Sequence, residues 1–133
     1  MFLIRTRIGP SRIHGVGVFA LGAVPAGAVV WRYDPAFDRI VTAEELANSP
    51  PAFRAYLDAY AYPSHDLDGA TLLCCDHAKF LNHSDQPNTA ERPFTSVAIG
   101  PIAEGDEITC DYGAFCVGWQ GFGGAAPSRD GRA

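Results

Sequence analysis

The sequence predicts a single, mainly β domain that carries a small helical insert. Short runs of β-branched and aromatic residues recur along the chain, and glycine or proline follows most of them, which is typical of short strands joined by tight turns. Only residues 42–59 space their apolar side chains as a helix does. The length of 133 residues is that of one domain with one core.

Strands are expected in both halves of the chain, and turn residues set their bounds. Gly9-Pro10 is expected to end the first strand, and Gly69 precedes the first strand of the second half. The expected strands are residues 2–8, 17–20, 28–33, 39–41, 70–74, 94–99 and 107–112.

The helical insert has two recognisable start signals. Thr42 and Glu45 have the spacing of a capping box, which favours a helix beginning at that point. Ser49-Pro50 is a favourable start for a second short helix. The apolar residues that would share one face of this second helix are Phe53, Tyr56, Leu57 and Tyr60.

A weak internal repeat relates residues 20–30 to residues 98–108, and each copy reads as strand, turn and strand. Two such copies favour two similar β-units packed together rather than a solenoid. Residues 123–133 contain only Gly, Ala, Pro, Ser, Arg and Asp, a composition that cannot form a core. The domain is therefore expected to occupy residues 1–122, with a disordered tail at 123–133.

Composition and charge narrow the class of protein. The net charge of −5 disfavours binding to a nucleic-acid backbone and favours a basic partner. The longest apolar run, residues 22–31, contains Pro25 and is far shorter than the roughly 20 residues that span a bilayer. With neither a membrane segment nor a secretory signal visible, a cytoplasmic location is expected. The four cysteines form no Cys-x-x-Cys pair and are expected to be reduced thiols.

The stretch Gly15-Val16-Gly17 is the first candidate for chemistry. A dinucleotide-binding fingerprint would need a helix directly after it, but Gly22 and Pro25 follow among β-branched residues. Two glycines in an extended turn would instead let the backbone approach a ligand closely. A plain tight turn is the alternative interpretation of this stretch.

Two later stretches are also rich in polar groups. Residues 79–88 read Lys-Phe-Leu-Asn-His-Ser-Asp-Gln-Pro-Asn, and residues 105–113 read Gly-Asp-Glu-Ile-Thr-Cys-Asp-Tyr-Gly. Amide, imidazole and hydroxyl groups crowd the first of them, while an aromatic hydroxyl ends the second. A structural turn around Pro87 and a buried tyrosine at a strand end are the corresponding alternatives.

Taken in this order, the three stretches resemble the Gly-x-Gly, Asn-His-Ser-x-x-Pro-Asn and Gly-Glu-Glu-Ile-Thr-x-Asp-Tyr-Gly motifs of the SET-domain family of protein-lysine methyltransferases. Asp106 is a conservative departure from the third motif. The resemblance covers about residues 1–115. It implies a mainly β, β-clip-like fold of several short sheets, in which the C-terminal part is threaded in a knot-like arrangement.

The resemblance also implies a cofactor, S-adenosylmethionine, and residues that would bind it. The backbone of the Gly-x-Gly stretch would contact its methionine portion, Asn82 its amino group and the backbone of His83 its adenine. Lys79 stands where the family usually has arginine. The full expected cofactor-binding set is Gly15, Val16, Gly17, Lys79, Asn82, His83, Tyr112 and Trp119.

Tyr112 aligns with the active-site tyrosine of the family, and Tyr60 resembles a second tyrosine of the lysine channel, with Tyr62 close behind. Core packing is the alternative for Tyr60 and Tyr62. Cys116 does not belong to a Cys-rich zinc motif of the kind that closes the channel in many relatives, so no metal is expected. The aromatic residues that could wall the site instead are Phe115, Trp119 and Phe122.

The leading hypothesis is an enzyme that methylates a lysine amine of a basic protein or peptide substrate. Two alternatives remain open at this point. One is a catalytically weak SET-like module that binds cofactor or peptide. The other is a homodimer in which the partner completes the site.

Overall fold

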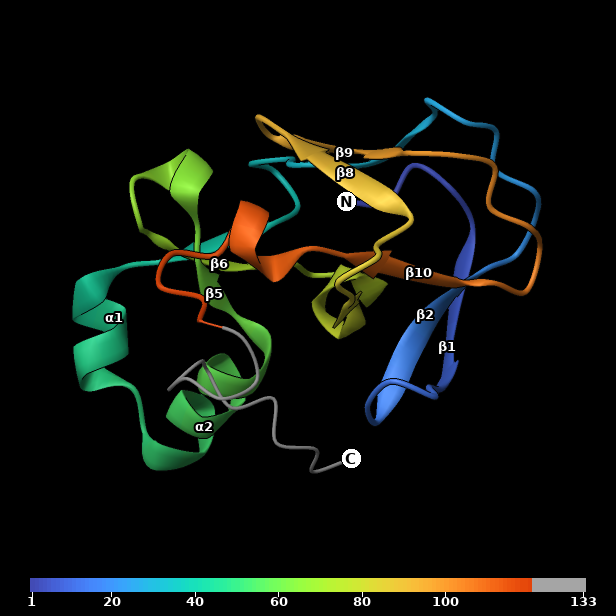
Figure 1. Cartoon of the computed structure of the whole chain (residues 1–133). Coiled ribbons are helices and arrows are strands. Elements are labelled where there is room, and N and C mark those ends of the chain that lie inside the picture. The colour runs from blue at the N-terminus through green and yellow to red at the C-terminus, as the bar shows by residue number, and fades with distance from the viewer. Residues whose placement is uncertain (121–133) are drawn as a thin grey trace.

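The computed structural model describes residues 1–120, and within them ten strands form three small sheets beside two short α-helices (Figure 1). The strands are β1 (Thr6–Pro10), β2 (Val16–Ala20), β3 (Val29–Arg32), β4 (Arg39–Val41), β5 (Tyr62–Pro63), β6 (Thr71–Leu73), β7 (Asn82–His83), β8 (Thr89–Arg92), β9 (Thr95–Ala98) and β10 (Glu107–Cys110). The helices are α1 (Ala43–Asn48) and α2 (Pro51–Tyr60), with 3-10 turns η1 (His65–Leu67), η2 (His77–Phe80) and η3 (Tyr112–Ala114). The predicted mainly β fold with a helical insert is confirmed.

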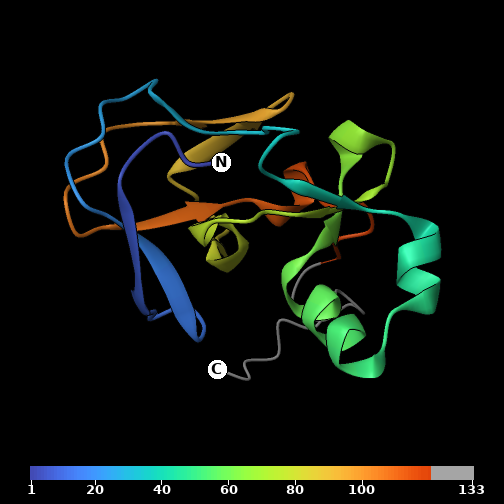
Figure 2. The ribbon, with the colours of Figure 1, turned by 180° about the vertical axis from the view of Figure 1, so that it is seen from behind.

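The first sheet has the order β1-β2-β10-β7, and β10 runs through the middle of the molecule (Figures 1 and 2). The β1–β2 ribbon lies at one end and the helices at the other. The predicted end of the first strand at Gly9-Pro10 is wrong, because Gly9 pairs with Gly17 and Pro10 with Val16. Since β1 is an edge strand, the missing N–H of Pro10 breaks no sheet hydrogen bond.

The second sheet has the order β3-β9-β8. The two repeated segments, residues 20–30 and 98–108, also pair with each other. Val24 and Ile102 exchange backbone hydrogen bonds of 2.8 and 2.9 Å at the centre. On either side, Ala20 N–H donates to Asp106 and Ala98 N–H donates to Ala28. The prediction of two similar β-units packed together is therefore confirmed.

Gly27 and Gly105 occupy equivalent places in these two units, and their φ angles are 80° and 88°. Both angles lie in the left-handed region, which favours glycine because it lacks a Cβ. The two copies therefore share a glycine with positive φ as well as their apolar positions.

The third sheet, β4-β6-β5, supports the helical insert. Thr42 caps α1, since its hydroxyl accepts from the N–H of Glu45 while the Glu45 carboxylate accepts from the N–H of Thr42. Leu57 of α2 packs into a small core against β4 and β6. The buried members of this core are Val41, Leu57, Ala61 and Leu73.

Thr42→Ala is expected to lower the free energy of unfolding by about 1 kcal/mol, because the first turn of α1 loses its cap. Urea unfolding followed by circular dichroism measures this difference. Glu44→Ala is the matched control: it changes the same turn, leaves the box intact and should cost only about 0.3 kcal/mol. Equal losses in the two variants would contradict the capping role of Thr42.

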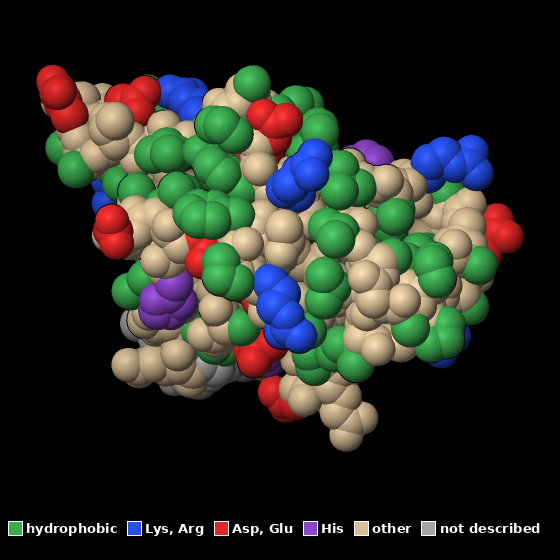
Figure 3. Space-filling view, turned by 90° about the horizontal axis from the view of Figure 1, so that it is seen from above, with side chains coloured by type: hydrophobic (Ala, Val, Ile, Leu, Met, Phe, Trp, Pro, Cys, Tyr) green, Lys and Arg blue, Asp and Glu red, His purple; other side chains and the backbone are tan. Residues whose placement is uncertain are grey.

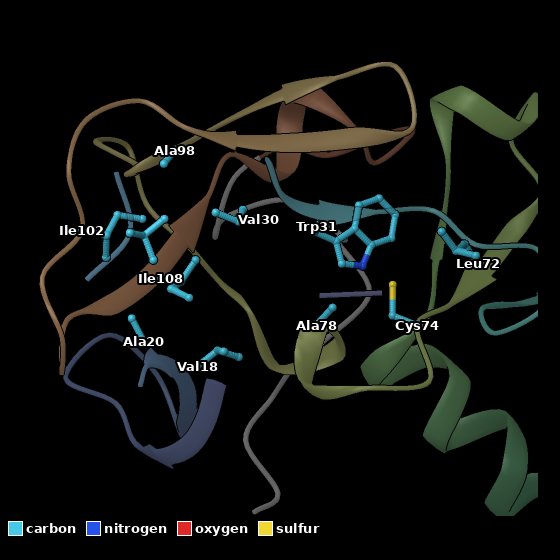
Figure 4. Close-up of a cluster of buried hydrophobic side chains, with 11 residues drawn as sticks. Val18, Ala20, Val30, Trp31, Leu72, Cys74, Ala78, Ala98, Ile102 and Ile108 are labelled. Carbon is cyan, nitrogen blue, oxygen red and sulfur yellow. The ribbon is translucent and has the colours of Figure 1, made fainter. Parts of the chain in front are cut away.

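A larger core lies beneath the other two sheets (Figure 4). Its centre consists of three side chains that are at most 2% exposed: Val18 of β2, Ile108 of β10 and Ile102 of the second repeat unit. Trp31 extends this core toward Cys74, Ala78 and Leu72. No helix in residues 1–120 is long and apolar enough to cross a bilayer.

Candidate active site

Asn82 lies at the centre of a cluster of oxygen atoms from two separate parts of the chain, residues 11–16 and Glu107. Its Nδ2 lies 3.1 Å from the carbonyl oxygen of His14, 3.0 Å from that of Val16 and 2.9 Å from Oε1 of Glu107. The Ser11 hydroxyl oxygen is also 3.1 Å away. Because every neighbour is an acceptor, the amide orientation is fixed with its NH2 group toward the cluster.

The Glu107 carboxylate connects this cluster to the glycine turn. It accepts from the Ser11 hydroxyl at 2.9 Å and lies directly over Gly17. A Cβ at Gly17 would come within 2.1 Å of the carboxylate oxygen. Position 17 therefore has to lack a Cβ so that the Glu107 carboxylate can lie against its backbone. Gly15 instead adopts a φ of 47° in the turn itself.

Sequence reasoning missed Ser11 and Glu107 as members of this cluster. Glu107 lies inside the third motif, so its acidic side chain beside Asp106 was a usable signal. Ser11 carried no signal, because it belongs to none of the three motifs.

His83 fixes the backbone at Tyr112. Its Nδ1 accepts from the N–H of Tyr112 at 3.1 Å, and its Nε2 lies 3.1 Å from Oδ1 of Asp85. Since the Tyr112 N–H can only donate, the neutral imidazole carries its proton on Nε2. The Asn82-His83 strand thus links the oxygen cluster directly to the tyrosine.

Tyr112 itself is buried and held at both ends. Its hydroxyl donates to the carbonyl of Leu81. Its ring meets Trp119 and Phe115 edge to face, with centroids 5.0 and 5.8 Å away. Trp119 also lies 5.1 Å from the His83 ring. The structure therefore brings together Asn82, His83, Tyr112 and Trp119, while Phe122 lies outside the described residues.

A cavity opens against Tyr112, and its walls are mainly apolar. Its lining residues are Trp31, Tyr62, Cys74, Ala78, Leu81, Glu91, Ser96, Cys110, Tyr112 and Phe115. A second hollow shares Trp31, Tyr62, Glu91 and Phe115 with it. Tyr62, which sequence reasoning placed behind Tyr60, is thus a wall residue of both.

Burial controls the protonation of groups in this cavity. It raises the pKa of the Cys74 thiol to about 12 and the pKa of the Tyr62 phenol well above its usual value. Burial also raises the pKa of Glu91 to about 7, although the Ser96 hydroxyl bond opposes the shift. Sequence reasoning did not single out Glu91, because an acidic residue in a short polar strand has the pattern of a solvent-exposed one.

Two of the predicted site residues lie elsewhere. The Lys79 ammonium is 5.8 Å from the ring centroid of Tyr56 on α2. The Tyr60 ring contacts those of Tyr56 and Phe80 at 4.8 and 5.4 Å, and Tyr60 is not a lining residue of the cavity beside Tyr112. The roles assigned to Lys79 and Tyr60 remain predictions.

The family model of the SET domain matches residues 15–113, which is most of the chain. The protein therefore belongs to the SET domain family. A search of curated protein sequences finds no match.

Solved structures share the fold. One is a humanized mutant of the Chaetomium thermophilum Polycomb Repressive Complex 2 bound to the inhibitor GSK126, with 19% identity and a TM-score of 0.60. The match covers 83% of this chain and 15% of that one. Another is a Plasmodium falciparum protein assigned as a histone methyltransferase, with 22% identity and a TM-score of 0.54. That match covers 82% of this chain and 97% of the other. At these identities the likeness concerns the fold.

Proposed function

We propose that the protein transfers a methyl group from S-adenosylmethionine to the side-chain amine of a lysine in a protein substrate. The proposal rests on Tyr112, which takes part in both candidate sites. Its backbone N–H bonds to His83, next to the Asn82 cluster, and its side chain lines the apolar cavity. Transfer between two bound ligands requires two sites that meet at one wall, so that the reacting atoms are held in line.

The oxygen cluster around Asn82 fits the amino-acid end of the cofactor. An amide NH2 has two hydrogens, whereas four acceptor oxygens lie within 3.1 Å of Nδ2. The cluster therefore has more acceptor oxygens than the amide can satisfy, and it keeps capacity to accept from a further donor. A ligand ammonium group supplies three donors and a positive charge that the carboxylate would attract.

When bound, S-adenosylmethionine supplies an electrophilic methyl group on a sulfonium sulfur. The chain's part is to align and desolvate the amine. The hydrogen bond to Leu81 fixes the Tyr112 phenol oxygen at the cavity wall, where it can accept an N–H from the incoming amine. An apolar cavity lowers the pKa of a lysine inside it and so favours the neutral, nucleophilic form.

A basic protein is the substrate class that the charge supports. The chain carries a net charge of −5, which attracts basic segments over a range of about 10 Å. On the face drawn in Figure 3, described Lys and Arg side chains are scattered among neutral and acidic ones. The histone methyltransferase assignment of the Plasmodium falciparum protein is in keeping with such a substrate.

Incubation with methyl-labelled S-adenosylmethionine and a panel of basic proteins tests the proposal. Label is expected on the panel, and mass spectrometry of the product should place the added methyl group on lysine side chains. Cofactor binding without transfer to any member of the panel would support a binding module instead. Light scattering during chromatography decides the homodimer alternative, because an active monomer needs no partner to complete its site.

A further inference from the structure

Glu91 is an acidic residue that the fold places at the cavity rather than on the outer surface. It lies on β8 directly opposite Ser96 of β9, and the Ser96 hydroxyl donates to its Oε1 at 3.0 Å. Within residues 1–120 no hydrogen bond to Oε2 and no ion pair of this carboxylate is present. One carboxylate oxygen is therefore anchored, and the other remains available to a ligand.

The walls around Glu91 select for a cation with a narrow apolar stem. Trp31, Tyr62 and Phe115 contribute aromatic surface to both hollows that Glu91 lines. No Lys, Arg or His of residues 1–120 lines either hollow, while Asp66 adds a second carboxylate to the second one. Aromatic faces and carboxylates both attract an alkylammonium group, and the apolar walls accommodate its methylene chain.

A carboxylate in such a position opposes stability unless something compensates it. Placing a charge in an apolar, partly desolvated site without a counter-ion is unfavourable. The β8–β9 pairing itself needs no acid at position 91, because the ladder uses backbone groups. A cationic ligand that enters the cavity would provide the missing partner.

Building on the proposed methyl transfer, we propose that Glu91 binds the ammonium of the substrate lysine and accepts its proton before the methyl group moves. The N–H bond breaks and an O–H bond forms on the carboxylate. The amine lone pair then forms the N–C bond while the C–S bond breaks, leaving its electron pair on sulfur as a neutral thioether. The proton passes from Glu91 to solvent after product release.

The surroundings of Glu91 suit a base that works near neutral pH. Burial raises its pKa to about 7, and the carboxylates of Asp66 and Asp111 add to the shift. Among residues 1–120, the other titratable groups that line the cavity are the phenols of Tyr62 and Tyr112 and the thiols of Cys74 and Cys110. A base is most effective when its pKa lies close to the working pH.

Binding of n-butylammonium to the full chain tests the cation site without any methyl transfer. Trp31 lines the cavity, so tryptophan fluorescence at pH 8 reports occupancy. Butylammonium is expected to bind at least 10-fold more tightly to the native chain than to Glu91→Gln, while n-butanol should not distinguish them. Equal affinity of butylammonium for both proteins would overturn the cation site. Glu104→Gln removes the same charge from an exposed position and should behave as the native chain.

Steady-state kinetics test proton acceptance. Glu91→Gln keeps the shape and the Ser96 bond, and should lower kcat/KM at pH 7.5 about 100-fold with unchanged affinity for S-adenosylmethionine. The loss should shrink as pH approaches 10, where the substrate supplies free amine. A pH-independent loss would overturn the base role. Thermal unfolding checks that the variant folds, and it should be at least as stable as the native chain above pH 7.

The two proposals fail separately. If the native chain transfers no methyl group but binds butylammonium through Glu91, the methyl-transfer proposal falls and the cation site stands. If transfer occurs and Glu91→Gln matches Glu104→Gln in both assays, the role of Glu91 is wrong and the methyl transfer stands.

Discussion

Asn82→Ala is expected to weaken the binding of S-adenosylmethionine about 10³-fold, equivalent to about 4 kcal/mol. The amide is 4% exposed and holds together the Ser11 hydroxyl, the Val16 carbonyl and the Glu107 carboxylate. Without it, the partly buried carboxylate loses a donor and the oxygen atoms repel one another. The free energy of unfolding should also fall, by about 2 kcal/mol. Calorimetric titration and urea unfolding measure the two effects.

Asn82→Asp sharpens this test because it preserves the shape of the side chain. It replaces the donor with a second carboxylate facing Glu107, so it should damage cofactor binding at least as much as alanine does. Asn48→Ala, at the exposed end of α1, is the control and should leave both quantities unchanged. Retained binding in Asn82→Asp would contradict the donor role of the amide.

The sequence predicts the strands that have strong local signals and misses those that depend on tertiary contacts. β4 is predicted at its exact bounds, and α1 begins where the Thr42 capping box indicates. β5 and β7 have two residues each, too few for an alternating pattern to be visible. β8 contains Glu91 and Arg92 and lacks a β-type composition, because its pairing with β9 decides its structure.

The candidate site shows the same division. The order of the three motifs is enough to direct attention to Asn82, His83 and Tyr112, because each motif contains unusual polar residues in a fixed pattern. The partners of these residues cannot be predicted in this way. Ser11 and Glu107 are separated by 96 positions and meet only because β10 pairs with β2.

Tyr60 and Tyr62 illustrate how local spacing can mislead. They lie two residues apart, but Tyr60 ends α2 and Tyr62 begins β5. The change from helix to strand turns their side chains to different surroundings, so Tyr60 packs on Phe80 while Tyr62 lines the cavity. Only the position of that boundary decides which ring faces the site, and boundaries are the least predictable part of an element.

Tyr112→Phe is expected to lower kcat of methyl transfer on the order of 10³-fold while affinity for S-adenosylmethionine stays nearly the same. The variant keeps the ring contacts with His83, Phe115 and Trp119 and the backbone bond to His83. It removes only the hydroxyl, which bonds to Leu81 at the cavity wall. The loss should therefore appear in the alignment of the amine rather than in the fold.

Single-turnover measurements with saturating cofactor separate the chemical step from binding and product release. Tyr56→Phe, on the exposed side of α2, removes an equivalent hydroxyl far from the cavity and should retain full activity. A tenfold or smaller loss in Tyr112→Phe would mean that the apolar walls and Glu91 align the amine without the phenol. A large loss confined to KM would instead place the hydroxyl in ground-state binding, because an interaction made equally in the ground and transition states does not change kcat.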